Sequence, residues 1–553
     1  MSIYPTRTAA HLAIAGVLVF AVGIALREAV VVSWGGALLA AVALARAVTL
    51  VSVMRIRAAG FEMLWTGSAR RARTRPGGVV TLLAEVRNRD TLSARYDKLR
   101  VVASPALQTW VEPLAGEVPA TGSVKLLVHV RALRVGYHGI YGLALEVRGA
   151  PGLFEVPLTF ANPYGIEVLP KALARPLMLP HGGRSRTLAM SGRAGRQRGE
   201  GTDLHELREL VPGDSFRRIA WKASAKRGRL VVKEFEREER DVVMIVVDCS
   251  VEHWSGPMGG APLDRSIDLT ASLAAHHLTQ GDHVGLRLIG SRELCRLEPD
   301  GGRPQAGRVV AALLDHAGVL DVDRSGWDES DLAVQVTEHL RPLDPRAVSD
   351  LRQNRIDKLV ARAEGMLSHA PFNRPTPQGQ SPNDAKLRRY AACFGLHTPP
   401  RLEPDGGRTQ VVLAEVFHDL ARHKKRKTKV SIVHVVAPAP PESSLEGLKK
   451  VIRKLRGRGV QIRWTTPPVA TPLDRPTSAP QVERDQPPPP VATDDLGERL
   501  PIVERVVVMR AALANRRGEQ LLRRLGVKIV RPSRPLAVRQ LPEVPPERDE
   551  QVA

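Results

Sequence analysis

Apolar residues are concentrated in two long runs near the N-terminus. The first run extends from about Ala9 to Leu26 and contains His11 as its one strongly polar side chain. After a short Arg-Glu turn, the second run extends from about Ala29 to Met54 and is broken by Arg46. A helix needs about 20 apolar residues to cross the hydrocarbon core of a bilayer. Both runs are close to that length, so the sequence predicts a transmembrane helical hairpin within residues 1–57.

A cleaved signal peptide is the main alternative interpretation of the first run. That run is long for a signal peptide, however, and a second apolar run follows it at once.

Basic residues predict the orientation of the hairpin, because segments rich in Lys and Arg stay in the cytoplasm. Arg7 precedes the first run, and a group of arginines follows the second: Arg55, Arg57, Arg70, Arg71, Arg73 and Arg75. We therefore expect an inner (cytoplasmic) membrane protein with both termini and the soluble body in the cytoplasm.

Short runs of branched residues dominate the next region, residues 58–170. They are separated by Gly, Pro, Asn and Asp clusters and comprise Val79–Val86, Leu99–Ser104, Val124–Val130, Leu143–Val147 and Ile166–Leu169. Several short strands at this spacing predict a β-sandwich-like domain. Residues 171–200 are rich in Arg, Gly and Pro and have little periodicity, so we expect an exposed linker there.

Residues 242–530 alternate between strand and helix patterns. Val242–Val247 is wholly apolar and ends at Asp248, which indicates a strand buried on both faces of a parallel sheet. Further strands are expected at Gly281–Ile289, Val430–Ala437, Val460–Trp464 and Val527–Val530, and helices at Ser266–Leu278, Val309–His316, Leu445–Leu455 and Arg510–Leu525. This alternation predicts a doubly wound α/β domain.

Three segments depart from the α/β pattern. A polar, largely helical stretch of about 320–400 is expected to be an insertion into the domain. The Pro-rich stretch of about 466–495 is expected to be a solvated loop. Residues 531–553 are expected to form a disordered tail.

A formal net charge of +23 favours anionic partners such as phospholipid, nucleic acid or acidic proteins. Because Arg is scattered through every segment, a generally basic surface explains the same charge. A nucleic-acid-binding, membrane-associated protein is the alternative function, but the 4% aromatic content leaves few side chains to stack on bases.

Three cysteines without a CxxC pair indicate neither a disulfide framework nor a cysteine zinc site.

One short motif occurs twice. Arg296–Arg303 reads Arg-Leu-Glu-Pro-Asp-Gly-Gly-Arg, and the same eight residues recur at Arg401–Arg408. Pro-Asp-Gly-Gly is turn chemistry. We expect two similar turns that each lead from a strand into a helix.

The most distinctive segment is residues 201–241. Pro212-Gly-Asp214 predicts a turn, a helical pattern ending at Gly228 follows, and Leu230–Phe235 is expected to be a strand. From Phe216 to Lys233 every charged side chain is positive. These side chains are Arg217, Arg218, Lys222, Lys226, Arg227, Arg229 and Lys233. This basic run is either a docking surface or a solvated face neutralised by the acidic residues that follow it.

This segment resembles the signature of the bacterial domain-of-unknown-function 58 (DUF58) family. The matching residues are Arg208, Pro212, Gly213, Asp214, Arg218, Ile219, Trp221, Lys222, Ser224 and Ala225. Leu210, Ala220 and Lys226 depart from the family pattern, in which Tyr, Asp and Arg are usual. Within the signature, we expect Trp221 to be a core residue and Arg218 and Lys222 to contribute to docking.

The resemblance implies two N-terminal membrane helices, a β-rich region and a C-terminal domain like that of von Willebrand factor type A. It also implies a scaffold or adaptor that acts with MoxR-type AAA+ ATPases, and with other type A-domain proteins, in the assembly or maturation of protein complexes. Catalysis is not implied.

The same resemblance implies a cation site. Type A domains hold a divalent metal through Asp-x-Ser-x-Ser, a distant Thr and a distant Asp, and such hard oxygen ligands suit Mg²⁺. Here Asp248 and Ser250 match, Glu252 replaces the second Ser, and Thr409 is the candidate distant Thr. No Asp follows the strand Val430–Val436, so both a Mg²⁺ site and a metal-free scaffold remain open.

The sequence contains no recognisable catalytic motif, so we do not expect an enzyme. His205-Glu-Leu-Arg-Glu209 lacks the second His of a zinc-protease helix. The sequence contains neither a Gly-x-Ser-x-Gly elbow nor a Gly-Lys-Ser/Thr phosphate loop. We therefore expect a protein that works by binding partners.

Overall fold

The computed structural model describes residues 3–67, 69–148, 151–174, 193–212, 214–239, 241–254, 256, 258–343, 356–422, 430–467 and 495–531. The chain divides into two compact units. Unit 1 contains Met1–Leu169 and Gly318–Arg401, and unit 2 contains Pro170–Ala317 and Leu402–Ala553. Each unit is therefore built from two separate stretches of sequence.

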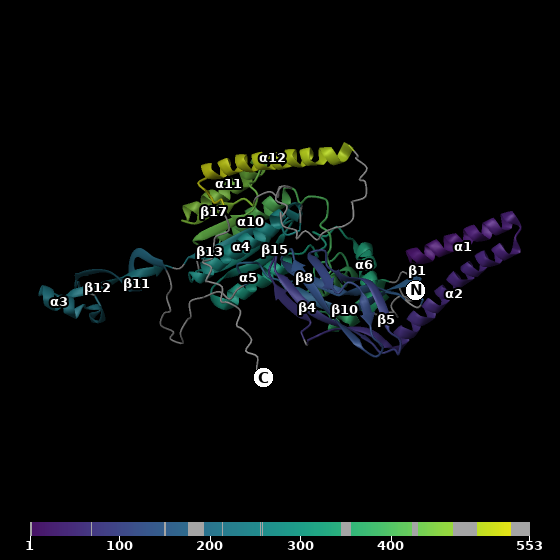
Figure 1. Ribbon diagram of the computed structural model, residues 1–553. Coiled ribbons are helices and arrows are strands. Elements are labelled where there is room, and N and C mark those ends of the chain that lie inside the picture. The colour runs from purple at the N-terminus through teal and green to yellow at the C-terminus, as the bar shows by residue number, and fades with distance from the viewer. Residues whose placement is uncertain are drawn as a thin grey trace, which may run out of the picture. The chain divides into compact units, whose positions relative to one another are not determined.

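Unit 1 begins with a helical hairpin, α1 (Arg7–Leu26) and α2 (Ala29–Gly60), whose helices lie side by side (Figure 1). Both helices are long and apolar enough to cross a membrane, which confirms the two predicted apolar helices. Small residues let their backbones approach closely. A Cβ atom added at Gly35 would lie 2.4 Å from the backbone nitrogen of Phe20.

The second helix continues into the β domain. Its 32 residues exceed the roughly 20 that a membrane span needs. Near its end, Val53 and Ile56 are buried in the sandwich core, and the Arg55 guanidinium lies 3.2 Å from the Asp90 carboxylate. The hairpin therefore joins the β domain directly.

Two sheets form the β domain of unit 1. Its strands are β1 (Tyr4–Pro5), β2 (Phe61–Trp65), β3 (Arg71–Thr74), β4 (Val79–Asn88), β5 (Ala94–Ala103), β6 (Leu107–Glu112), β7 (Gly116–Val118), β8 (Ser123–Ala132), β9 (Gly136–Arg148) and β10 (Phe154–Val168). One sheet has the order β1-β10-β9-β5-β7 with β3 also paired to β10, and the other has the order β2-β4-β8-β6. Alternating apolar residues from both sheets share one core.

The second stretch of unit 1 is helical. It contains α6 (Glu329–Leu343), α8 (Ile356–Met366), the 3₁₀ turn η3 (Leu367–His369) and α9 (Pro382–Phe394). The expected insertion of about 320–400 is thus helical, but it belongs to unit 1 and not to the α/β unit. It packs on the sandwich, where the Tyr141 hydroxyl donates a hydrogen bond to the Gly395 carbonyl at 3.0 Å.

A six-stranded sheet forms the centre of unit 2, in the order β15-β14-β13-β16-β17-β18. The strands are β13 (Val242–Asp248), β14 (His283–Ile289), β15 (Glu293–Asp300), β16 (Ile432–Val436), β17 (Gln461–Thr465) and β18 (Lys528–Ile529). All neighbours are parallel except β15, which runs antiparallel to β14. Every residue of β13 is buried, as a strand covered on both faces requires.

Helices cover both faces of this sheet. The helices are α4 (Pro262–Thr279), α5 (Gly302–His316), α10 (Arg408–Arg422), α11 (Glu442–Gly457) and α12 (Asp495–Arg524), with a 3₁₀ turn η2 (Val251–Trp254) after β13. Met244 and Val246 share a core with α10 and α11, while α4 packs against β13 and β14. Consecutive residues of β13 therefore face opposite helical layers, as the predicted α/β domain requires.

A separate two-stranded arm precedes the sheet. It consists of β11 (Arg193–Glu209), the 3₁₀ turn η1 (Phe216–Arg218), α3 (Trp221–Arg227) and β12 (Val231–Glu239). Figure 1 shows α3 at the far end of the arm. The predicted linker 171–200 was therefore wrong over residues 193–200, which belong to β11.

Some predictions fall beyond the described residues. These include positions 175–192 of the predicted linker, positions 468–494 of the Pro-rich loop and positions 532–553 of the tail. Elements missed inside the described part include β2, β3, β6, β7 and β11. They also include β15, whose sequence overlaps the first repeat copy, and the N-terminal half of α12, which begins at Asp495.

Candidate functional site

A pocket opens at the carboxyl ends of the parallel strands of unit 2. It is lined by Asp248 at the end of β13, Ile289 at the end of β14, Ala437 just after β16, and Trp464 in β17. The strand order reverses between β13 and β16, since the chain adds β14 on one side of β13 and β16 on the other. Ligands of open α/β sheets bind at this kind of switch point.

The loop after β13 carries the acidic centre of the pocket. The Asp248 carboxylate accepts a hydrogen bond from the Ser250 backbone N–H at 2.9 Å, which fixes the turn. His253 lies on the other side of that carboxylate, with its Nε2 atom 3.7 Å from Asp248 Oδ2. Asp248 and Ser250 are both buried, so the carboxylate is held in a largely dehydrated place.

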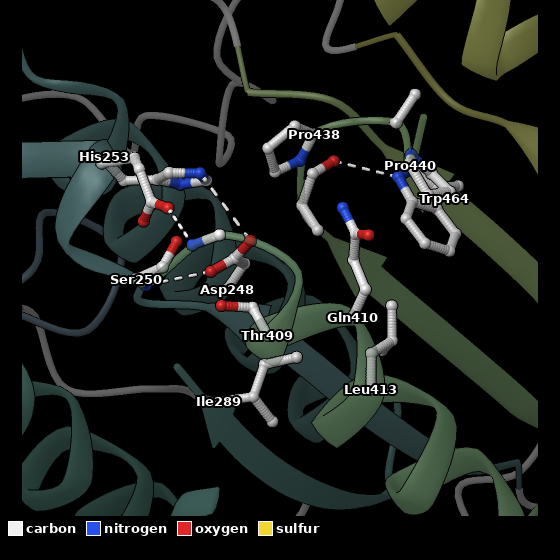
Figure 2. Close-up of a pocket in the computed structure, with 14 residues that line it drawn as sticks. Asp248, Ser250, His253, Ile289, Thr409, Gln410, Leu413, Pro438, Pro440 and Trp464 are labelled. Atoms are coloured by element: carbon white, nitrogen blue, oxygen red, sulfur yellow. Dashed lines mark hydrogen bonds and ion pairs between the residues drawn. The ribbon is translucent and has the colours of Figure 1, made fainter. Parts of the chain in front are cut away.

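Thr409 approaches from the opposite side, on the first turn of α10. Its side chain is 6% exposed, and its hydroxyl has no hydrogen-bond partner within the described part of the chain. Figure 2 shows this hydroxyl directed toward Asp248. Burying a hydroxyl without a partner is costly, so the position is suited to a ligand that the Thr409 oxygen would contact.

Two backbone contacts hold the loop after β13 against the loop before α10. The Val251 N–H donates to Asp405 Oδ2 at 3.2 Å, and the Gly406 N–H donates to Glu252 Oε1 at 3.0 Å. Each loop therefore supplies a carboxylate that binds a backbone N–H of the other. This reciprocal pairing positions Asp248 and Thr409 relative to each other.

The four predicted metal-site residues all line this one pocket: Asp248, Ser250, Glu252 and Thr409. The Glu252 carboxylate joins the two loops through the Gly406 N–H, and the other candidate oxygens are those of the Asp248 carboxylate and of the Ser250 and Thr409 hydroxyls. Among the described residues, no three His, Cys, Asp or Glu side chains cluster as metal ligands. The donor set is thus one carboxylate with hydroxyls, a hard-oxygen set that fits Mg²⁺ better than Zn²⁺.

Three residues of this site were not predicted: Asp405, His253 and Gln410. Asp405 was visible in the sequence as part of the second repeat copy, which was interpreted only as a turn. Both copies precede a helix, but the first copy lies mostly within the strand β15 and the second follows the helix α9, so the predicted pair of similar strand-to-helix turns was wrong. The second copy also supplies Asp405 to the loop pairing. His253 and Gln410 carried no motif that could have identified them.

The signature residues of the arm fall into two groups. Arg208 and Asp214 form a bidentate ion pair, with both nitrogen–oxygen distances at 2.7 Å. The Ser224 hydroxyl accepts a hydrogen bond from the Val231 N–H at 2.9 Å. These three residues fix the shape of the turn, so their place in the signature has a structural reason.

The second group faces solvent. Trp221 is 66% exposed, so its predicted role as a core residue was wrong. Ile219 and Ala220 fill the small core of the arm instead. Lys222 and Pro212 are also exposed, while Gly213 and the side chain of Arg218 lie outside the described part.

Comparison with protein families identifies the family that the signature segment matches. Residues 206–360 match the family described as "Protein of unknown function DUF58". These residues belong to the DUF58 family. The match confirms the family that the Arg208–Ala225 signature indicated. It runs from the arm through β13, α4, β14, β15 and α5 into the helices of unit 1, so it includes Asp248, Ser250 and Glu252 but not Thr409.

No curated protein matches the chain. Solved structures that resemble parts of it include a PapD-like domain of human CEP192, with 15% identity over 20% of this chain and 86% of that chain and a TM-score of 0.16. The E. coli chaperone DraB shows 18% identity over 20% of this chain and 57% of that chain, with a TM-score of 0.14. The Caenorhabditis elegans protein WR4, an MSP family member, shows 9% identity over 20% of this chain and 96% of that chain, with a TM-score of 0.14. Similarity at this level gives no information about function.

Proposed function

We propose that this chain is a membrane-anchored scaffold or adaptor whose α/β domain docks a partner protein at the Asp248 pocket. The observation that supports this function best is the convergence of Asp248, Ser250 and Thr409 at the switch point of the sheet. The buried Thr409 hydroxyl without a partner indicates that the pocket is shaped for a ligand. A binding function accounts for this geometry without a reaction step.

The α/β domain is best interpreted as similar to von Willebrand factor type A. Two observations support this: the parallel sheet has one antiparallel edge strand, and the Asp-x-Ser sequence follows the central strand β13. In that interpretation Asp248, Ser250 and Thr409 would hold Mg²⁺. The metal would supply an open coordination position, which suits a carboxylate of the partner.

Glu252 departs from the type A pattern. Its carboxylate accepts the Gly406 N–H and so helps to join the two loops. The residue that replaces the second Ser therefore has a role of its own. We propose that it positions the Thr409 loop and is not a metal ligand.

The proposed location is the cytoplasmic membrane, with the soluble body in the cytoplasm. The two apolar helices support membrane association, and the arginines on either side of the hairpin support the orientation. The DUF58 family resemblance suggests the partner, an AAA+ ATPase of the MoxR type. Such a soluble ATPase would meet the α/β domain at the inner leaflet.

Affinity purification of the full-length chain from native membranes tests this function. We expect an AAA+ ATPase to be recovered in the presence of Mg²⁺ and to be lost with EDTA or in the Asp248→Ala variant. Asp300→Ala is the matched control, because Asp300 is an exposed carboxylate at the end of β15 in the same sheet. If no AAA+ ATPase is recovered, or if Asp248→Ala recovers it as well as the wild type, the proposed function is wrong.

A further inference from the structure

The end of the β-arm, residues 210–230, exposes several large apolar side chains. Among its large apolar side chains Phe216 is 73% exposed, Trp221 66%, Val211 54% and Leu230 43%. Large exposed apolar side chains scattered singly over a surface are ordinary, but several on one short segment indicate an interaction site. We call residues 210–230 the arm tip.

The fold of the arm tip does not depend on its exposed aromatic residues. The Arg208–Asp214 ion pair holds the turn, and Ser224 bonds the start of β12. Ile219 forms a bridge to Val232, and both are buried. Phe216 and Trp221 therefore remain available for a contact outside the arm.

Apart from Asp214, which pairs with Arg208, the charged side chains of the arm tip are all positive. Arg217, Lys222, Lys226 and Arg227 are exposed, and none of the four forms an ion pair with a described carboxylate. Arg229 is paired, with Glu209. The surface that accompanies Phe216 and Trp221 thus carries four positive charges that no described carboxylate pairs with, which favours an anionic partner.

We infer that the arm tip docks on an anionic lipid surface through Phe216 and Trp221, with Arg217, Lys222, Lys226 and Arg227 contacting lipid phosphates. Trp and Phe insert at the level of lipid head groups, and basic residues beside them bind anionic lipid. Two of the four cations are lysines, which are depleted in protein–protein interfaces but serve lipid surfaces as well as arginines do.

The chain itself would keep such a surface within reach. This inference rests on the membrane anchoring proposed above and is independent of the Asp248 pocket. An anchored chain meets its membrane at a high effective concentration, so a contact that is weak in solution becomes populated. Each cation near an anionic surface strengthens binding about fivefold, and the apolar side chains add to this.

Hydrogen–deuterium exchange of the full-length chain in nanodiscs tests the inference. Exchange of the backbone amides of residues 214–230 is compared in phosphatidylcholine nanodiscs and in nanodiscs that also contain phosphatidylglycerol. We expect exchange to slow at least about tenfold in the anionic nanodiscs. High salt should reverse the protection, because it screens exposed charges.

Two variants separate docking from folding. The Phe216→Ser/Trp221→Ser and Lys222→Glu/Lys226→Glu double variants should lose the lipid-dependent protection and keep the wild-type melting temperature, since all four side chains are exposed. Lys450→Glu/Lys454→Glu is the matched control, because these are two exposed lysines on α11 of the same unit. It should leave the protection intact.

Three outcomes overturn the inference. One is equal exchange of residues 214–230 in both kinds of nanodisc, and another is full protection in the arm-tip variants. The third is protection that polyglutamate induces in phosphatidylcholine nanodiscs while anionic lipid induces none, because the site would then fit an acidic protein segment. None of these results bears on ATPase recovery, so the two proposals fail separately.

Discussion

At the scale of single residues, unit 1 depends on a charge buried in its helical part. The Arg388 guanidinium in α9 lies 2.9 Å from the Asp384 carboxylate, and both side chains are fully buried. Arg388 also donates hydrogen bonds to the carbonyls of Leu320 and Trp327. One arginine therefore connects α9 to the segment that precedes α6.

Arg388→Ala should destabilise unit 1 by about 3–5 kcal/mol, because it leaves the Asp384 carboxylate buried without its cation. Urea unfolding followed by circular dichroism measures this loss. Lys386→Ala is the control on the same helix, since its ion pair with Glu364 is exposed and should cost less than about 1 kcal/mol. Equal losses in the two variants would contradict the buried-pair account.

Two buried histidines make the stability of unit 1 sensitive to acid. Burial lowers the pKa of His138 and of His339 to about 4, from an ordinary value of 6.5. The unfolded chain therefore takes up protons at these sites between pH 6.5 and 4 while the folded chain does not. Stability is unaffected above pH 6.5 and falls by about 1.4 kcal/mol per pH unit for each histidine as pH decreases through this window.

His339→Gln should reduce that pH dependence by about 1.4 kcal/mol per pH unit between pH 6.5 and 4. Urea unfolding of unit 1 at a series of pH values gives the slope. His369→Gln is the control, because His369 is exposed at η3, and its slope should match the wild type. An unchanged slope in His339→Gln would show that this histidine is not held neutral.

Residues that belong to a motif could be associated with one another from the sequence, whereas the exposure of a residue could not be predicted. Asp248 and Thr409 were predicted as metal ligands from the resemblance to type A domains, and the fold brings both to one pocket. Trp221 was placed in a core because aromatic residues usually lie there. The core of the arm is too small to bury an indole ring. The size of a core cannot be predicted from a local sequence pattern.

At the scale of elements, the α1–α2 hairpin depends on close backbone contact. Gly35→Leu should separate the helices, because a Cβ atom there would meet the Phe20 backbone at 2.4 Å. Gly36→Leu is the adjacent control, whose nearest contact is a Phe20 ring carbon at 4.0 Å. Pulsed EPR between nitroxides at exposed Ile14 and Leu44 should report a longer distance for Gly35→Leu only. The same distance in both variants would contradict this packing.

Elements with strong hydrophobic patterns were predicted close to their observed bounds. β13 was expected at Val242–Val247 and is observed at Val242–Asp248. β15 was missed because it is an edge strand in which half-buried and exposed residues mix, so its sequence reads as polar. The helix expected behind the Pro212 turn is divided into η1 and α3, because Ile219 adopts an extended conformation and pairs with Val232 of β12, and the Ala220 N–H donates to the Val231 carbonyl.

At the scale of the whole molecule, sequence order does not follow the units. The helical stretch of about 320–400 interrupts the α/β domain in sequence but packs on the β-sandwich. The contact is close, since a Cβ atom at Gly139 of β9 would lie 2.1 Å from the Phe394 carbonyl oxygen. Periodicity identified these helices but contains no information about which unit they join.

Gly139→Val should therefore destabilise unit 1 by roughly 3 kcal/mol through overpacking and leave unit 2 unchanged. Calorimetry of the full-length chain should show the first effect as one lowered transition. Gly365→Ala in α8 is the control, because its Cβ meets nothing within 4 Å and should be neutral or slightly stabilising. A uniform shift of all transitions would contradict two separately stable units.

The central claim is that the pocket at Asp248 is a docking site built on a divalent cation. Isothermal titration calorimetry of the purified full-length chain with Mg²⁺ tests it most directly. We predict one Mg²⁺ site that Asp248→Ala abolishes and that Thr409→Val weakens at least about tenfold, while Thr409→Ser, which keeps the hydroxyl, binds nearly as the wild type does. A wild-type chain that binds no Mg²⁺, or an Asp248→Ala variant that binds it equally well, would contradict the claim.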